Sequence, residues 1–343
     1  MNNSERTNTI NKWVFIGGAS RSGTSLLQAI LNENSICTSP PESHILETFA
    51  YAPMSFINES FKDRKRLLDL LVKDKWIHRL NIDPEKVISK LTDESTTIDL
   101  FRIYMEEYAS RANKRIMVDG CPINIWFLKR LKEDFPGCYI LHIVRDPRDV
   151  VISTQKAQYN DKFIFPPPQI AKQFLTGYLQ SIRFAKEYGN RYHKIYYEEL
   201  ISDPEKVVRS ICKFLEITFE FKMLEFQESG KKVAAVEESW KENLSKPILK
   251  DNFGKWKTEM KKKDIIQVEY ICRRFFELEK KHYQPSKLMS GKNILTNWTG
   301  LLPYHLSEVK RKLRSTLKRE IPKIRPDDFS PFERLKINGM VED

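Results

Sequence analysis

Short apolar runs alternate with helix-like stretches along this chain. The runs lie at 12–17, 115–119, 138–144 and 193–197, and the first, third and fourth lead directly into residues typical of a helix start. Strands that alternate with helices usually form a mainly parallel sheet, because each helix returns the chain to the edge where the next strand begins. The pattern therefore predicts an α/β fold with a central, mainly parallel sheet flanked by helices.

The turn after the first run combines glycine, hydroxyl and arginine residues. Gly18 and Gly23 have the G-x-x-x-x-G spacing of a phosphate-binding loop, but Thr24 stands where ATP and GTP sites carry lysine. The positive charge comes from Arg21 instead, and the hydroxyl donors are Ser22, Thr24 and Ser25. The N–H groups of residues 21–25 would point at a bound anion from the positive end of the following helix. This turn therefore predicts a site for a phosphate-like anion.

A second strand-to-helix junction carries another arginine. Asp146 is the predicted N-cap of the helix after the third run, and a proline follows it at the first helical position. Arg145 closes the strand and Ser153 lies two turns into the helix, so both can flank one bound dianion. The alternative is an ordinary salt bridge from Arg145 to Asp146 or Asp149, and for Arg148 we prefer this structural interpretation.

A third junction follows the run at 193–197. The strand is predicted to end at Tyr197, and Asp203 with the proline after it begins the next helix. The ring of Tyr197 offers a flat face to a purine, or it belongs to the core. Ligands of parallel sheets bind at the carboxyl ends of the strands, where Arg21, Arg145 and Tyr197 are all expected to lie.

These motifs resemble those of sulfotransferases that use 3′-phosphoadenosine 5′-phosphosulfate (PAPS). The sequence Ser-Arg-Ser-Gly-Thr-Ser-Leu-Leu at 20–27 is similar to the 5′-phosphosulfate loop of that family, and 140–153 is similar to its 3′-phosphate motif. The resemblance implies a P-loop, nucleotide-kinase-like fold and a PAPS cosubstrate, with no metal required. It implies that residues 21–25 bind the 5′-phosphosulfate, that Arg145 and Ser153 hold the 3′-phosphate, and that Tyr197 packs near the adenine.

The same resemblance indicates a base that takes the proton of the acceptor hydroxyl. Pro40 and the proline after it make a stiff, extended approach that holds Glu42 outside a helix. The ungapped spacing from Arg21 to Glu42 resembles that of the tyrosylprotein branch, in which a glutamate is the base. His44 is the rival, because aryl and steroid sulfotransferases use a histidine, and it could also help to position the acceptor. The structural alternative for Glu42 itself is a surface loop acid. His142 lies inside a strand and is expected to be a core histidine.

Two segments depart from the family pattern or add to it. Many relatives have a lysine at the position of Gly120, so Arg21 or another cation would have to steady the transferring group. The segment 246–257 resembles the last cosubstrate loop of the family. Lys246 and Lys255 are therefore candidate phosphate ligands, whereas Trp256 is expected to serve packing.

Composition restricts the remaining possibilities. The net charge of +12 is spread among many acidic residues without a nucleic-acid-binding signature, so we expect no nucleic-acid partner. The five cysteines show no metal-like pairing, which predicts buried free thiols and a cytoplasmic protein. Residues 1–11 are polar, so no signal peptide is expected.

We expect one sulfotransferase domain over 12–285, with 45–110 as a helical insertion on the acceptor side. Residues 286–343 form a basic extension, whose predicted helix at 307–319 would dock on the domain rather than touch a membrane or an anionic acceptor. The acceptor is a hydroxyl-bearing molecule, and the sequence leaves its identity and the oligomeric state open. The alternatives are an ATP-dependent small-molecule kinase of P-loop fold and a non-catalytic nucleotide-binding protein.

Overall fold

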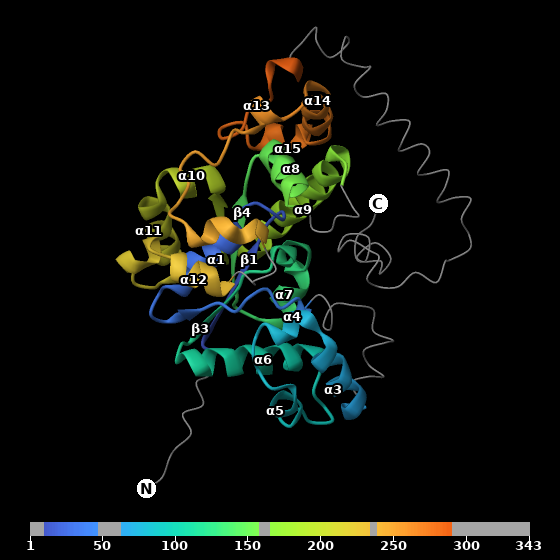
Figure 1. Cartoon of the computed structure of the whole chain (residues 1–343), viewed down its shortest axis with the longest axis vertical. Helices are drawn as coiled ribbons and strands as arrows, with labels where there is room; N and C mark the ends of the chain where they lie inside the picture. Colours follow the sequence, from blue (N-terminus) through green and yellow to red (C-terminus); the bar gives the residue numbers. More distant parts are fainter. Residues whose placement is uncertain (1–9, 47–62, 158–164, 234–238, 290–343) are drawn as a thin grey trace, which may run out of the picture. The chain divides into compact units, whose positions relative to one another are not determined.

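The computed structural model describes residues 10–46, 63–157, 165–233 and 239–289 (Figure 1). They divide into two compact units. Unit 1 consists of the described residues up to Val144 and those from Gln180 to Asp251. Unit 2 consists of the described residues from Arg145 to Leu179 and from Asn252 onward. The predicted basic helix at 307–319 lies outside the described residues.

Unit 1 is built around a five-stranded sheet in which every neighbouring pair is parallel. The strand order is β2-β3-β1-β4-β5. The strands are β1 (Lys12–Gly17), β2 (Cys37–Thr38), β3 (Ile116–Asp119), β4 (Tyr139–Val144) and β5 (Tyr192–Tyr196). All four predicted strands are confirmed to within one residue at each end. The short β2 was missed, because two residues are too few to show a hydrophobic period.

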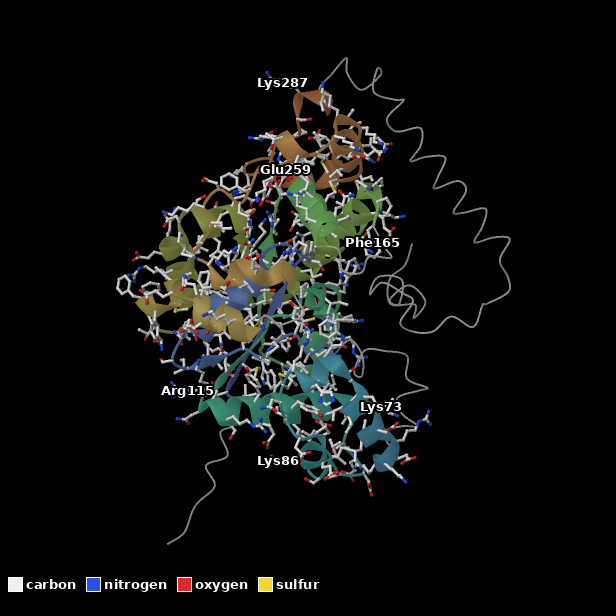
Figure 2. The ribbon with its side chains drawn as sticks, in the orientation of Figure 1. Lys73, Lys86, Arg115, Phe165, Glu259 and Lys287 are labelled. Carbon is white, nitrogen blue, oxygen red and sulfur yellow. The ribbon has the colours of Figure 1, made fainter. Side chains whose placement is uncertain are left out.

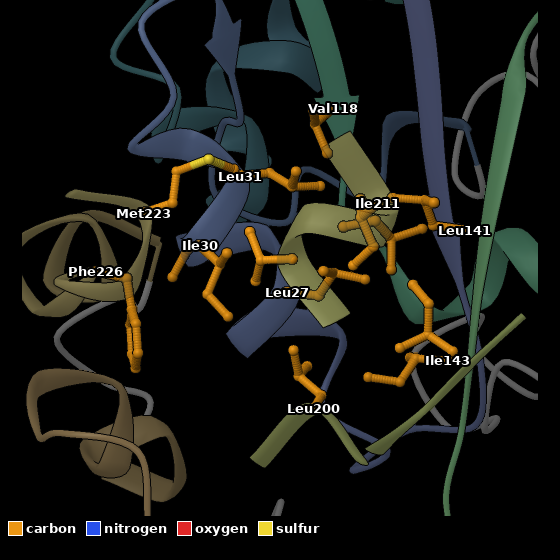
Figure 3. Packing of buried hydrophobic residues seen from close by; sticks show 14 of the residues in the cluster. Leu27, Ile30, Leu31, Val118, Leu141, Ile143, Leu200, Ile211, Met223 and Phe226 are labelled. Atoms are coloured by element: carbon orange, nitrogen blue, oxygen red, sulfur yellow. The ribbon is translucent and has the colours of Figure 1, made fainter. Parts of the chain in front are cut away.

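Both faces of the sheet are buried. Val14 and Ile16 of β1 pack in a core cluster with residues of α1 (Thr24–Asn32), among them Leu27 (Figure 3). The alternate residues Trp13 and Phe15 pack on the other side: both contact Phe135, and Trp13 also contacts Phe101. A strand that is covered on both faces is apolar along its whole length, as is usual in parallel sheets.

The other helices of unit 1 connect the strands or extend from them. The segment before β3 is helical, as predicted for 45–110, within its described part. The α-helices are α3 (Arg64–Lys73), α4 (Lys75–His78), α5 (Pro84–Ile88), α6 (Thr97–Ala112), α7 (Leu128–Asp134), α10 (Tyr197–Ser202), α11 (Pro204–Leu215) and α12 (Gln227–Val233). The 3-10 helices are η2 (Pro122–Trp126), η3 (Gly189–Arg191), η4 (Phe221–Leu224) and η5 (Ser239–Ser245). Asp203 caps α11 as predicted, by accepting a hydrogen bond from the Lys206 N–H at 3.3 Å.

Unit 2 contains α8 (Pro147–Lys156), α13 (Trp256–Glu259), α14 (Lys262–Ile271), α15 (Arg273–Leu278) and η6 (Lys287–Met289). The long α9 (Pro167–Tyr188) begins in unit 2 and ends in unit 1. As predicted, Asp146 caps α8, with its side chain accepting the N–H of Arg148 at 2.9 Å. At the carboxyl end of α8, Lys156 pairs with Glu259 at 2.7 Å. Figure 2 labels Glu259 among the side chains of this unit.

Unit 2 contains a buried ion-pair network around Arg148. Its guanidinium lies 2.6 Å from carboxylate oxygens of both Asp146 and Glu269. The same group stacks 3.6 Å from the ring of Trp256. The structural interpretation of Arg148 and the packing role of Trp256 are therefore both confirmed.

All five cysteines are buried and free, as predicted. His142 is also a core residue, 2 % exposed, and its Nδ1 contacts the hydroxyl groups of Tyr192 and Ser181. Within the described segments, no helix has the length and apolar character that crossing a membrane requires.

Candidate active site at the carboxyl edge of the sheet

The glycine-rich turn connects β1 to α1. Gly23 is the N-cap of α1 with φ 100°, and no side chain of the described residues caps this helix. The N–H of Ser22 is used within the turn, donating to the Ala19 carbonyl at 3.1 Å. The first N–H groups of a helix have no partner inside it, so the start of α1 offers donors to an anion. Arg21 lies in the turn itself, with φ 69°.

Both loop glycines are required by close neighbours. A Cβ at Gly18 would lie 2.5 Å from the carbonyl oxygen of Ile143, and one at Gly23 would lie 2.5 Å from the ring of Tyr197. Tyr197 is 5 % exposed and belongs to the core cluster of unit 1. Its ring therefore supports the turn, which leaves the adenine contact a prediction.

The hydroxyl group of Ser22 supports an anion site at this turn. Ser22 is fully buried, and its Oγ has no hydrogen-bond partner among the residues that the structure describes. A buried hydroxyl without a partner costs about 1 to 3 kcal/mol. Thr24, the first residue of α1, is 3 % exposed. Both hydroxyls come from a turn whose backbone already favours negative charge.

Glu42 lies beside the start of α1. It follows β2, outside any helix as predicted, and is 9 % exposed. Its Oε1 accepts a hydrogen bond from the Ser25 Oγ at 3.3 Å. Because β2, β3 and β1 are adjacent and parallel, the segments that leave them share one edge of the sheet. The structure thus brings the predicted base and the predicted anion loop together within unit 1.

The rival base lies next to Glu42. His44 Nε2 is 3.7 Å from Glu42 Oε2, and His44 Nδ1 is 3.8 Å from the Sγ of Cys121. The His44 ring packs on Trp76 of α4, with ring centroids 4.4 Å apart. His44 has φ 52°, in the left-handed region that non-glycine residues rarely adopt. Helix α4 therefore reaches the candidate base through Trp76.

Asp119 is a nearby titratable group that belongs to none of the sequence motifs. It ends β3, is 4 % exposed, and its Oδ2 accepts a hydrogen bond from Asn124 Nδ2 at 2.9 Å. Burial raises the pKa of Asp119 to about 6; the Asn124 bond and His44 oppose this rise, and the charge of Glu42 adds to it. An acidic residue at the carboxyl end of a buried strand was the signal that could have found it.

This raised pKa predicts a pH-dependent stability. As the pH rises from about 4 to 6, the unfolded chain releases the Asp119 proton while the folded chain holds it, so the protein loses stability. Two units of pKa correspond to about 3 kcal/mol. Asp119→Asn should therefore be more stable than the wild type by about 2 to 3 kcal/mol at pH 7 and equally stable near pH 4.

Urea denaturation at both pH values measures the difference. The exposed Asp93 provides the control, since Asp93→Asn should follow the wild type at both. If the free energy of unfolding of Asp119→Asn depended on pH in the same way as that of the wild type, the raised pKa of Asp119 would be contradicted.

The remaining predicted ligands lie in different settings. Lys246 is in unit 1 and forms an exposed ion pair with Glu242 at 2.5 Å. Arg145 is in unit 2, 5 % exposed, and its Nη2 donates to the Asn252 carbonyl at 2.9 Å. Ser153 lies on α8 of the same unit. The roles of these residues as phosphate ligands stay predictions.

Lys255 belongs to a segment whose backbone is hydrogen-bonded to α8. Asp149 of α8 accepts hydrogen bonds from the N–H groups of Gly254 at 2.5 Å and Trp256 at 3.0 Å. The backbone on both sides of Lys255 is therefore held to the helix that carries Ser153. Its role as a phosphate ligand also stays a prediction.

Comparison with known proteins identifies the family. A parallel sheet with a phosphate-loop-like turn after its central strand defines an α/β protein of P-loop type. The model of the sulfotransferase family matches residues 14–220, which is more than half of the chain, and the chain belongs to that family.

Named relatives agree with this assignment, and two solved structures share the fold. Protein-tyrosine sulfotransferase A of Caenorhabditis elegans is 26 % identical, over 73 % of this chain and 62 % of the relative. The sulfotransferase domain from the curacin biosynthetic pathway has a TM-score of 0.55 at 20 % identity, covering 78 % of this chain and 98 % of that one. The corresponding domain of the Synechococcus PCC 7002 olefin synthase also has a TM-score of 0.55, at 23 % identity and with coverage of 78 % and 95 %.

The two solved structures confirm the fold. The chain spans 33 % to 65 % of the length of the curated relatives that it matches.

Proposed function

We propose that this protein transfers a sulfuryl group from PAPS to a hydroxyl group of an acceptor. Membership of the sulfotransferase family supports the class of reaction. The observation that carries the assignment to these residues is the hydrogen bond from Ser25 to Glu42, because it joins a carboxylate to the first turn of an anion-binding helix. Thr24 in place of the lysine of ATP sites favours PAPS over a nucleoside triphosphate.

In the proposed reaction the acceptor oxygen attacks sulfur in line with the leaving phosphate. A new bond forms between that oxygen and sulfur, the bond from sulfur to the phosphate oxygen breaks, and 3′-phosphoadenosine 5′-phosphate (PAP) leaves. Glu42 accepts the proton of the acceptor hydroxyl as a general base. Arg21 and the N–H groups at the start of α1 stabilise the negative charge that develops on the leaving phosphate.

A ligand panel tests the proposed cosubstrate. PAP should raise the melting temperature of the protein more than AMP, ATP with Mg²⁺ or GTP, because it alone offers both phosphate groups of PAPS. A larger shift with ATP and Mg²⁺ would favour the small-molecule kinase. PAP binding without any transfer of radiolabelled sulfate to glycans, lipids or phenols would favour the non-catalytic binding protein.

Arg21 provides a second test of the proposed cosubstrate site. Arg21→Ala should weaken PAP binding in calorimetry by about tenfold or more, since hydrogen bonds to charged groups contribute about 1.5 to 3 kcal/mol. Arg115→Ala is the matched control, because Arg115 is exposed and precedes the amino end of β3, at the opposite edge of the sheet from the turn. Equal PAP affinity in wild type and Arg21→Ala would remove Arg21 from the site.

A further inference from the structure

One face of α1 holds the segment that carries Glu42. Ser25, Gln28 and Asn32 are spaced by three and four residues, so they lie on the same face of the helix. Ser25 Oγ donates to the Glu42 carboxylate at 3.3 Å, and Asn32 Oδ1 accepts the N–H of Ser39 at 2.9 Å.

Between these two contacts, Gln28 Nε2 donates to the carbonyl oxygen of Pro40. The segment from 39 to 42 is thus bonded to the helix at its beginning, its middle and its end.

The side chain of Gln28 occupies the space beside Gly120. A Cβ at Gly120 would lie 2.4 Å from Gln28 Cδ and 2.6 Å from its Oε1, which is too close for any real contact. The backbone at Gly120 is not in the left-handed region, so its conformation alone does not require glycine. Glycine is needed there because Gln28 fills the space. A lysine at this position is incompatible with Gln28 in its present place.

The amide group of Gln28 does more than fill volume. Gln28 is fully buried, and its Oε1 has no hydrogen-bond partner within the described residues. Such an unpaired oxygen costs free energy that an apolar side chain of similar size would avoid. The bond from Nε2 to the Pro40 carbonyl is the feature that methionine could not provide.

We infer that Gln28 is a positioning residue that fixes the Pro40–Glu42 segment against α1, and that Gly120 is the partner position that permits it. This inference rests on the proposed function, in which Glu42 is the base. The helix whose first turn binds the anion then also sets the distance between that anion and the base. Catalysis depends steeply on such distances, since a shift of about 1 Å can cost about 100-fold in rate.

Gln28→Met tests the inference. Methionine keeps the volume but cannot donate to the Pro40 carbonyl, so kcat should fall by about 10- to 100-fold while the KM for PAPS and the affinity for PAP stay unchanged. Gln180→Met is the matched control, because Gln180 Nε2 also donates to a backbone carbonyl, that of Trp126 at 2.9 Å. The control should keep the wild-type kcat. Wild-type kcat in Gln28→Met would overturn the inference.

Gly120 provides the second arm. Gly120→Ala should reproduce the loss of kcat by displacing Gln28, and it should have no further effect in a Gln28→Ala background. Additive losses in the double variant would mean that the two positions act separately, which contradicts the inference.

A structural readout keeps this test apart from the proposed function. Hydrogen exchange of the peptide covering 37–46 should be faster in Gln28→Met than in the wild type or in Gln180→Met, and unchanged exchange overturns the positioning role. Absence of any sulfate transfer by the wild type, with fast exchange in Gln28→Met, would instead reject the proposed function and retain the contact of Gln28 with the Pro40–Glu42 segment.

Discussion

Replacing Glu42 with glutamine is expected to lower kcat for sulfate transfer by about 10²- to 10⁴-fold, the usual contribution of a general base. Glutamine keeps the size of the side chain and an oxygen that can accept the Ser25 hydrogen bond, but it cannot take up a proton. The affinity for PAP should therefore stay at the wild-type value. Calorimetry and initial-rate measurements at saturating PAPS separate the two effects.

The control and the rival base decide how this result is interpreted. Glu133→Gln changes an exposed carboxylate on α7 and should leave kcat unaltered. His44 lies 3.7 Å from Glu42, so His44→Ala must be measured in parallel. If Glu42→Gln keeps the wild-type rate and His44→Ala loses it, the base is the histidine.

Replacing Arg148 with methionine is expected to destabilise the protein by about 3 to 5 kcal/mol. In the wild type, the Arg148 guanidinium lies 2.6 Å from the carboxylates of both Asp146 and Glu269. The substitution leaves these two carboxylates in the interior of unit 2 without their cation. The stacking contact with Trp256 at 3.6 Å is lost as well. The free energy of unfolding from denaturant titration measures the effect.

Arg209 serves as the surface counterpart of Arg148. It forms an exposed ion pair with Glu205 on α11 at 2.7 Å, and such pairs contribute about 1 kcal/mol or less. Arg209→Met should therefore cost little. Similar losses in the two variants would argue against an energetically special network around Arg148.

Much of the fold could be predicted because its signals are local. Four strands of the sheet are short apolar runs with clear ends, and caps such as Asp146 and Asp203 mark where the next helices begin. The strand β2 has two residues, and its place at the sheet edge is set by pairing with β3 rather than by its own pattern.

The site was predicted only in part, for a related reason. Arg21 and Glu42 stand in motifs with recognisable spacing, so the sequence alone could select them. The properties of Asp119 and Gln28 depend on residues that are distant in sequence. Burial at the end of β3 raises the pKa of Asp119. Gln28 bonds to the Pro40 carbonyl and fills the space beside Gly120. A single glutamine within a helix carries no signal of such contacts.

The burial of every thiol makes chemical labelling a natural probe of this protein. Burial raises the pKa of Cys121, Cys138 and Cys212 to about 11, so almost none of the reactive thiolate is present at neutral pH. A maleimide or disulfide reagent can therefore react with these thiols only after the surrounding structure opens locally. Cys121, beside His44, then reports openings around the base, and Cys272, in the interior of unit 2, reports those of the second unit.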